Sequence, residues 1–326
     1  MKPLSGIHHI TAITGDAQQN FDFYTRILGL RLVKKTVNFD DPTSYHFYYG
    51  TTHGAPGTIL TFFAWRSATP GRVGSGEIGA FALSVPRGSL SFWREHLAQH
   101  HIETKIATTF GTPALAFRDP DNIELELVES DDVRPAWNTK NIPFEYSIRG
   151  LHSATIATRD AMETANVLQE MMGFHFVDEE SGHARFALGD APSKNTSGEN
   201  ASDENASGDS GGGTFLDVVQ AKNAQRGQMG AGTIHHIAFR ASDDETQEAW
   251  RKALSQKGFG VSPIMDRSYF RSIYFREPGG VLFEIATDTP GFLIDESRET
   301  LGESLKLPPQ YEANRARIEQ VLPPLF

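Results

Sequence analysis

Two pairs of adjacent histidines stand near opposite ends of the 326-residue chain, each inside a short apolar stretch. The first pair is His8 and His9, and the second is His235 and His236. Further along, Glu284 interrupts another apolar stretch. Two histidines and one carboxylate with open coordination positions are typical of non-heme Fe(II) oxygenases, and the same donors bind Mn(II) and Zn(II). These residue types predict a mononuclear metal site, provided that the fold brings the three segments together.

The composition limits the classes of protein that need to be considered. The net charge of −11 argues against nucleic-acid binding, which needs a basic surface. No apolar run is long enough to span a membrane and the N-terminus has no apolar signal core, so we expect a cytoplasmic protein without a membrane partner. The chain has no cysteine, so any metal must be held by nitrogen and oxygen.

One structural unit recurs four times along the chain. Similar apolar strands open the units at 6–11, 78–85, 150–155 and 233–240. Each is followed by a residue of helix-capping type and then by helical apolar spacing; the expected caps are Asp16, Ser89, Asp160 and Asp243. Shorter strands are expected at 30–37, 45–49, 58–64, 104–108, 114–117, 123–128, 174–177, 184–188, 214–219, 272–275 and 281–286. The pattern predicts an α+β fold of four βαβββ modules.

The modules suggest a division into two domains of ordinary size. Modules one and two occupy residues 1–135, and modules three and four occupy 145–290. The stretch 190–213 is rich in Ser, Gly, Asn and Asp, which predicts a disordered insertion in a hairpin. The tail, 291–326, contains one expected helix at 311–321 and is expected to pack on the domains.

Alternation of side chains along a strand allows only one histidine of each pair to face a given cavity. Aligned on the expected helix caps, the second position holds His9, Ala82, Ser153 and His236, and the first holds His8, Phe81, His152 and His235. The second position varies between imidazole and small residues, as expected of a site that only some units use. We therefore predict His9 and His236 as metal ligands and the first position as packing. The remaining histidines, including His46, lack a repeat or a carboxylate partner and are expected at the surface or in the core.

The last strands of the units supply the candidate acids. Matching 117–126 with 275–284 makes Glu126 equivalent to Glu284. Unit three places Asp217 there, whereas unit one offers Phe62 or Thr61. Pairing units one and four would join His9, His236 and Glu284 and would leave a histidine-free cavity with Glu126, Ser153 and Asp217. Pairing units three and four would give one imidazole beside two carboxylates, so we predict the first pairing.

With these residues in place, the chain resembles the vicinal oxygen chelate superfamily of glyoxalases and extradiol dioxygenases, in which such modules pair into two pseudo-barrel domains. Within it, the chain is most similar to the hydroquinone ring-cleaving dioxygenases, over nearly its whole length. The shared segments include 45–49, 266–274, 278–284 and 295–298. The resemblance implies an Fe(II) enzyme, with Mn or Zn as alternative metals, that acts on a small aromatic substrate with O₂. It also implies His9, His236 and Glu284 as the metal ligands.

The resemblance further implies roles beside the metal. Tyr274 is expected to hydrogen-bond the bound oxygen or phenolate, and Arg267 to stabilise developing negative charge. Thr11, two residues after His9, would share its cavity face and bind substrate. His235 is a weaker candidate for a proton shuttle, because strand alternation turns it away from the metal. No separate organic cofactor is expected.

Two other functions fit the same superfamily. A glyoxalase-type isomerase or lyase would want a fourth protein ligand, at the place where unit one offers Phe62 or Thr61. A metal-free, small-molecule-sequestering resistance protein would need no ligand set at all. The sequence is compatible with a homo-oligomer in each case.

Overall fold

The computed structural model describes residues 2–66, 68–189 and 213–326, so the insertion expected at 190–213 lies outside the described residues except for Gly213. Module one contains β1 (Ile7–Thr14), α1 (Ala17–Asp22), β2 (Arg31–Val37), β3 (Tyr45–Gly50) and β4 (Ile59–Ala64). Module two contains β5 (Glu77–Pro86), α2 (Leu90–Gln99), β6 (Lys105–Thr109), β7 (Thr112–Arg118) and β8 (Glu124–Ser130).

The second half of the chain repeats this order. Module three contains β9 (Gly150–Thr158), α3 (Ala161–Asn166), β10 (His175–Glu180), β11 (His183–Ala187) and β12 (Phe215–Gln220). Module four contains β13 (Ile234–Ala241), α4 (Asp244–Gln256), β14 (Met265–Asp266), β15 (Arg271–Arg276) and β16 (Leu282–Thr287). The four βαβββ modules are therefore confirmed, with β14 as a short strand that the sequence pattern did not reveal.

Acidic side chains begin three of the four module helices. Asp16, Asp160 and Asp243 each accept hydrogen bonds from backbone N–H groups of the first helical turn. These groups have no partner within the helix, so the caps stabilise the helix starts. Ser89 makes no such hydrogen bond, and its expected capping role is wrong.

The pairing of the modules decides which segments meet. β1 runs antiparallel to β13, and β5 runs antiparallel to β9. Each opening strand also pairs in parallel with the last strand of its own module, as β1 does with β4 and β13 with β16. The central strand order is β10-β11-β12-β9-β5-β13-β1-β4-β3-β2. The predicted pairing of unit one with unit four is confirmed.

The strand registers correct one expected equivalence. His9 lies opposite Ala238 in the β1–β13 pair, and Ser153, its counterpart, lies opposite Ala82 in the β5–β9 pair. Ala82 therefore corresponds to Ala238, and Ala80 takes the place corresponding to His236. The placement of Ala82 at the ligand position is wrong, because Ala80 lies nine residues before the expected cap Ser89, whereas His236 lies seven residues before Asp243.

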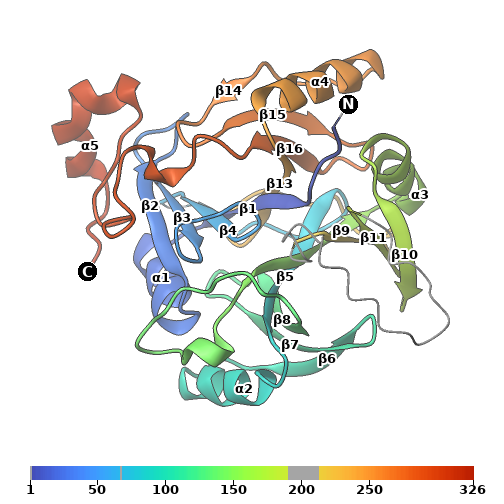
Figure 1. Cartoon of the computed structure of the whole chain (residues 1–326), viewed down its shortest axis with the longest axis horizontal. Helices are drawn as coiled ribbons and strands as arrows, with labels where there is room; N and C mark the ends of the chain where they lie inside the picture. Colours follow the sequence, from blue (N-terminus) through green and yellow to red (C-terminus); the bar gives the residue numbers. More distant parts are fainter. Residues whose placement is uncertain (1, 67, 190–212) are drawn as a thin grey trace, which may run out of the picture.

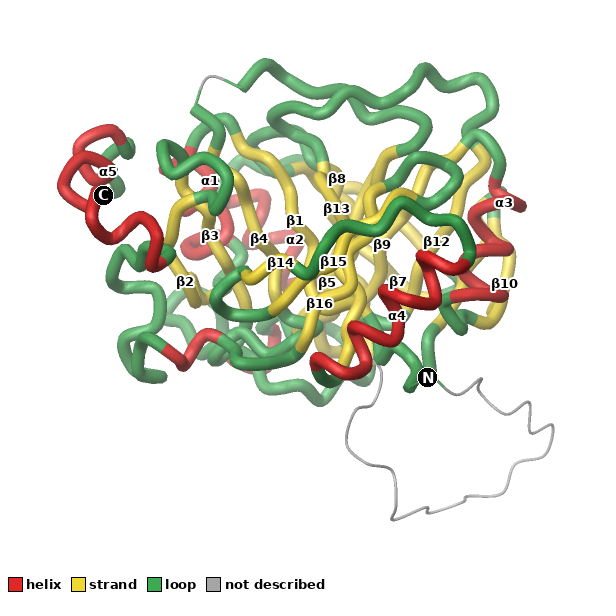
Figure 2. Tube along the Cα trace, turned by 90° about the horizontal axis from the view of Figure 1, so that it is seen from above, coloured by secondary structure: helices red, strands yellow, loops and turns green. Residues whose placement is uncertain are grey.

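The C-terminal tail packs against module one. It contains a 3-10 turn (Pro309–Asn314) and the helix α5 (Arg315–Val321), which lies beyond β2 at one end of the molecule (Figures 1 and 2). The buried Lys34 on β2 forms ion pairs with Asp295 and Glu296 at the start of the tail. Among the described residues, no helix has the length and apolar character to cross a lipid bilayer.

Candidate metal centre

Three neighbouring strands bring the predicted ligands together. His9 lies on β1, His236 on β13 and Glu284 on β16. Because Thr11 lies opposite His236, and Ala238 is paired with both His9 and Glu284, the registers place the three ligand side chains on one face of the sheet. All three are buried, and their candidate donor atoms lie within 4.8 Å of one another.

The donor atoms converge on a common point. Nε2 of His9 lies 3.3 Å from Nε2 of His236, and the two nitrogens lie 3.5 and 2.8 Å from Oε2 of Glu284. Oε2 is buried and has no hydrogen bond of ordinary geometry among the described residues, and its neighbours are these two imidazole nitrogens. A buried carboxylate oxygen without a donor is costly. The arrangement therefore fits a cation at this point, held by two nitrogens and one oxygen.

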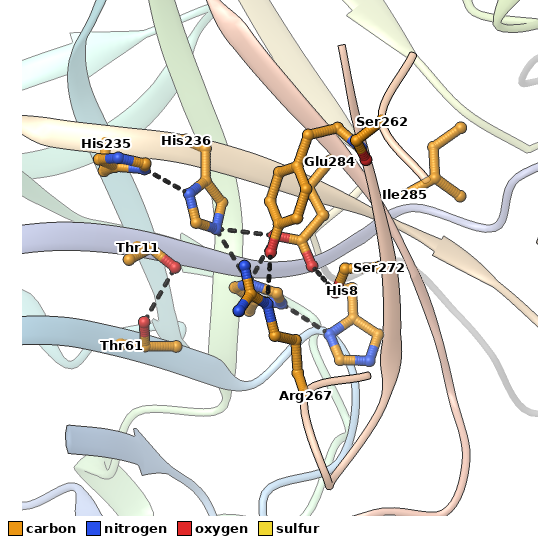
Figure 3. Close-up of polar contacts among 12 residues, drawn as sticks. His8, Thr11, Thr61, His235, His236, Ser262, Arg267, Ser272, Glu284 and Ile285 are labelled. Atoms are coloured by element: carbon orange, nitrogen blue, oxygen red, sulfur yellow. Dashed lines mark hydrogen bonds and ion pairs between the residues drawn. The ribbon is translucent and has the colours of Figure 1, made fainter. Parts of the chain in front are cut away.

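The other oxygen of Glu284 is anchored. Ser272 on β15 donates its hydroxyl to Oε1 over 2.5 Å, which leaves Oε2 turned toward the imidazoles (Figure 3). Burial opposes ionisation of Glu284, but the neighbouring His9 and His236 outweigh it and hold the pKa of this carboxyl well below its usual range. The group is thus an ionised, oriented carboxylate.

His8 and His235, the neighbours of the two predicted ligands His9 and His236, can accept hydrogen bonds from them in addition to packing. Nδ1 of His8 lies 2.9 Å from Nδ1 of His9, and Nδ1 of His235 lies 2.7 Å from Nδ1 of His236. A neutral histidine that offers its Nε2 lone pair to a metal carries its proton on Nδ1 and donates it to such a neighbour. Burial lowers the pKa of His8 well below its usual value, which favours a neutral ring that can accept this proton. The two rings also pack as expected of the first position, His8 against Phe270 and His235 against Phe63.

Tyr274 and Arg267 border the same site. Tyr274 on β15 is paired with Glu284, and its hydroxyl accepts a hydrogen bond from Nε of Arg267 over 3.4 Å. Burial raises the pKa of Tyr274, which keeps its own proton available for donation. Arg267 also lies 3.5 Å from Asp40, in the connection between β2 and β3.

Two connected spaces lead to the triad. An outer cavity of about 480 Å³ is bordered by His235, His236, Arg267 and Tyr274 together with the 38–44 connection. A small inner pocket of about 30 Å³ adjoins it and is lined by the triad and by Thr11. The outer cavity has the volume of a small-ligand site, whereas the inner pocket has room for little more than a water-sized group.

The inner pocket also contains residues that were not expected there. His46, predicted to lie at the surface or in the core, lines it together with Tyr48 and Phe270. His46 and Tyr48 are two positions apart on β3, so strand alternation alone could have placed them on one face. The sequence offers no sign of which face that is.

Modules two and three form the other half of the molecule, and this half has a different arrangement at the equivalent positions. There the registers place Ser153, Ala80 and Glu126 where modules one and four have His9, His236 and Glu284. The buried Arg185 donates two hydrogen bonds, each 2.7 Å long, to Asp217. An arginine–aspartate pair therefore stands beside these positions.

Comparisons with known proteins agree with this geometry. Residues 6–127 and 150–285 match the model of the Glyoxalase/Bleomycin resistance protein/Dioxygenase superfamily. The chain is 43% identical to MhqO of Bacillus subtilis, a protein assigned as a ring-cleaving dioxygenase, over 99% of this chain and 97% of that one. It is 35% identical to the chlorohydroquinone/hydroquinone 1,2-dioxygenase of Sphingobium indicum, over 95% of this chain and 93% of the relative.

Solved structures give the same result. A Bacillus subtilis protein described as a dioxygenase superposes with a TM-score of 0.91 at 42% identity, covering 100% of this chain and 99% of that one. Glyoxalase I from Zea mays shares the fold, with a TM-score of 0.62 at 15% identity over 87% of this chain and 92% of the maize chain. The chain therefore belongs to the Glyoxalase/Bleomycin resistance protein/Dioxygenase superfamily and, within it, to the group of ring-cleaving dioxygenases.

Proposed function

We propose that this protein is an Fe(II)-dependent dioxygenase that opens the ring of hydroquinone-type substrates with O₂. The observation that carries the proposal is the buried set of His9, His236 and Glu284, which supplies three protein ligands beside a cavity. Three ligands leave positions for a substrate oxygen and for O₂. The hydroquinone named in the Sphingobium relative supports the class of substrate.

The metal would be held by Nε2 of His9, Nε2 of His236 and Oε2 of Glu284. When bound, Fe(II) supplies acidification of a coordinated phenol and brings the phenolate and O₂ within reach of each other. In this protein Mn(II) or Zn(II) would fit the same donors, and the choice of iron rests on the dioxygenase chemistry.

The surrounding side chains orient the substrate and stabilise its charge. Tyr274 accepts a hydrogen bond from Arg267, so its own O–H is free to donate to a substrate oxygen. The guanidinium of Arg267 places a positive charge at the junction of the two spaces, where an anionic ring would lie. We assign substrate contact to Thr11, and to His235, which lines the outer cavity, the exchange of protons with solvent.

The competing functions fit these residues less well. A glyoxalase-type site would want a fourth protein ligand from β4, but the register places Thr61 at that position, paired with Thr11. The Thr61 hydroxyl already donates a hydrogen bond to Thr11. A metal-free sequestering protein would have no use for two buried imidazole nitrogens turned toward one carboxylate oxygen. Both observations favour a metal site with three protein ligands.

Oxygen uptake tests the proposal. The protein is loaded anaerobically with Fe(II), and O₂ consumption is measured with hydroquinone, methylhydroquinone and catechol. We expect uptake of one O₂ per ring opened with at least one hydroquinone, and none with His9→Ala. Ser153→Ala is the matched control, because Ser153 takes the place of His9 in the other half. No uptake with any of these substrates would reject the dioxygenase assignment.

A further inference from the structure

A buried chain of hydrogen bonds runs beside the triad and ends at Thr11, the residue to which we assign substrate contact. Its members are Tyr48 and His46 on β3, Thr61 on β4 and Thr11 on β1. Tyr48 Oη lies 3.0 Å from Nδ1 of His46, and Nε2 of His46 lies 3.0 Å from Oγ1 of Thr61. Oγ1 of Thr61 donates to Oγ1 of Thr11 over 2.9 Å. His46 is 7% exposed and the other three side chains 1% or less, so water does not compete for these bonds.

The hydrogen bonds of this chain all point in one direction, from Tyr48 toward Thr11. Because Thr61 spends its single proton on Thr11, it can only accept from His46. His46 must therefore carry its proton on Nε2, which leaves Nδ1 to accept from the hydroxyl of Tyr48. Burial lowers the pKa of His46 and raises that of Tyr48, so both groups are held in the neutral forms that this direction requires.

The chain of hydrogen bonds ends at the hydroxyl of Thr11, which lines the inner pocket. Thr11 lies opposite His236 in the β1–β13 pair and beside Thr61 in the β1–β4 pair, on the same strand face as His9. Its oxygen already accepts from Thr61, and no acceptor for its own proton is found among the residues that the structure describes. Thr11 thus faces the ligand pocket as a hydrogen-bond donor (Figure 3).

We propose that His46 is a positioning residue, which acts through Thr61 to make Thr11 donate a hydrogen bond to the oxygen of a phenol-type ligand bound at the triad. A donor at this place favours a phenolate oxygen over a protonated one, because hydrogen bonds to charged acceptors are the stronger ones. The proposal deepens the proposed function and depends on it only in taking the ligand to be a phenol.

The first test needs no phenol. The imidazole ¹⁵N and ¹H resonances of Zn(II)-loaded protein are recorded. The protein has 12 histidines, and the resonances of His46 are the ones that are missing from the spectrum of His46→Gln. We expect a neutral ring protonated on Nε2. A ring protonated on Nδ1, or a charged ring at neutral pH, would overturn the direction of the chain.

The second test measures equilibrium binding without turnover. Anaerobic calorimetry with Mn(II)-loaded protein and hydroquinone compares the wild type with variants along the chain. We expect about tenfold weaker binding for Thr11→Val, which loses the donor, and at least about threefold weaker binding for His46→Leu. His46→Gln should restore the affinity, since its amide N–H can donate to Thr61 while its carbonyl accepts from Tyr48.

Two controls separate positioning from damage to the fold. His152→Leu removes another buried histidine from the half without the triad and should leave hydroquinone binding unchanged. Metal content, measured by elemental analysis, should be equal in all variants. Wild-type affinity in His46→Leu, or weak binding in His46→Gln equal to that of His46→Leu, would overturn the proposal. If the wild type binds no phenol, both the proposed function and the assigned ligand are wrong. The imidazole resonances still decide the direction of the hydrogen bonds in that case.

Discussion

The hydrogen bond from Ser272 to Glu284 should control how well the triad holds its metal. Ser272 is fully buried, and its hydroxyl donates to Oε1 over 2.5 Å. In Ser272→Ala this oxygen loses its donor inside the protein, and the carboxylate is free to turn Oε2 away from His236. A hydrogen bond to a charged group contributes about 1.5–3 kcal/mol to stability. Losing an outer partner of a metal ligand lowers metal affinity by about 10–100-fold.

Two measurements follow from this reasoning. Competition against a chelator gives the Mn(II) or Zn(II) affinity, and urea unfolding of the metal-free protein gives the free energy of unfolding. Ser153→Ala is the control, because Ser153 is a buried serine at the place of His9 in the other half. Ser272→Ala should weaken metal binding by at least about tenfold relative to this control. Equal affinities in the two variants would refute the claim that Ser272 orients Glu284.

Three further outcomes are expected. Tyr274→Phe should lower the kcat for oxygen uptake by about 100-fold at unchanged metal content, since it removes one donor to a developing negative charge. Arg185→Met leaves Asp217 buried and unpaired, so urea unfolding should show a loss of about 3–5 kcal/mol with metal affinity unaltered. Burial lowers the pKa of His152 to about 3 from 6.5, so below pH 6.5 the unfolded chain binds the additional proton and stability falls. Between pH 7 and pH 5 the free energy of unfolding should therefore fall by about 2 kcal/mol less in His152→Gln than in the wild type. Urea unfolding at both pH values measures this difference.

The triad could be predicted because its members lie on strands of a repeated unit. Strand alternation separates His9 from His8, and comparison of the units identifies Glu284 as the acid that accompanies the histidines. Only the pairing of units one and four brings all three predicted ligands together, so the predicted fold identifies the site. Ala82 was misplaced because an equal distance from ligand position to helix cap was assumed in every unit, whereas in module two this distance is two residues longer than in module four.

The pocket around the triad could not be predicted from local patterns. His46 acts through Thr61 and Thr11, which lie on other strands, so its environment depends on the order of β3, β4 and β1 in the sheet. The contact of Arg267 with Asp40 likewise joins two connections more than 200 residues apart in the chain. Such contacts arise from tertiary packing, and a single sequence gives no register for them.

Anomalous diffraction at the iron edge tests the central claim most directly. Crystals are soaked anaerobically with Fe(II), and the anomalous difference map is calculated with and without hydroquinone. We predict one strong peak at bonding distance from Nε2 of His9, Nε2 of His236 and Oε2 of Glu284, with the hydroquinone oxygen as a further ligand. An absent peak at this point, or a metal with four protein ligands and no open position, would contradict it.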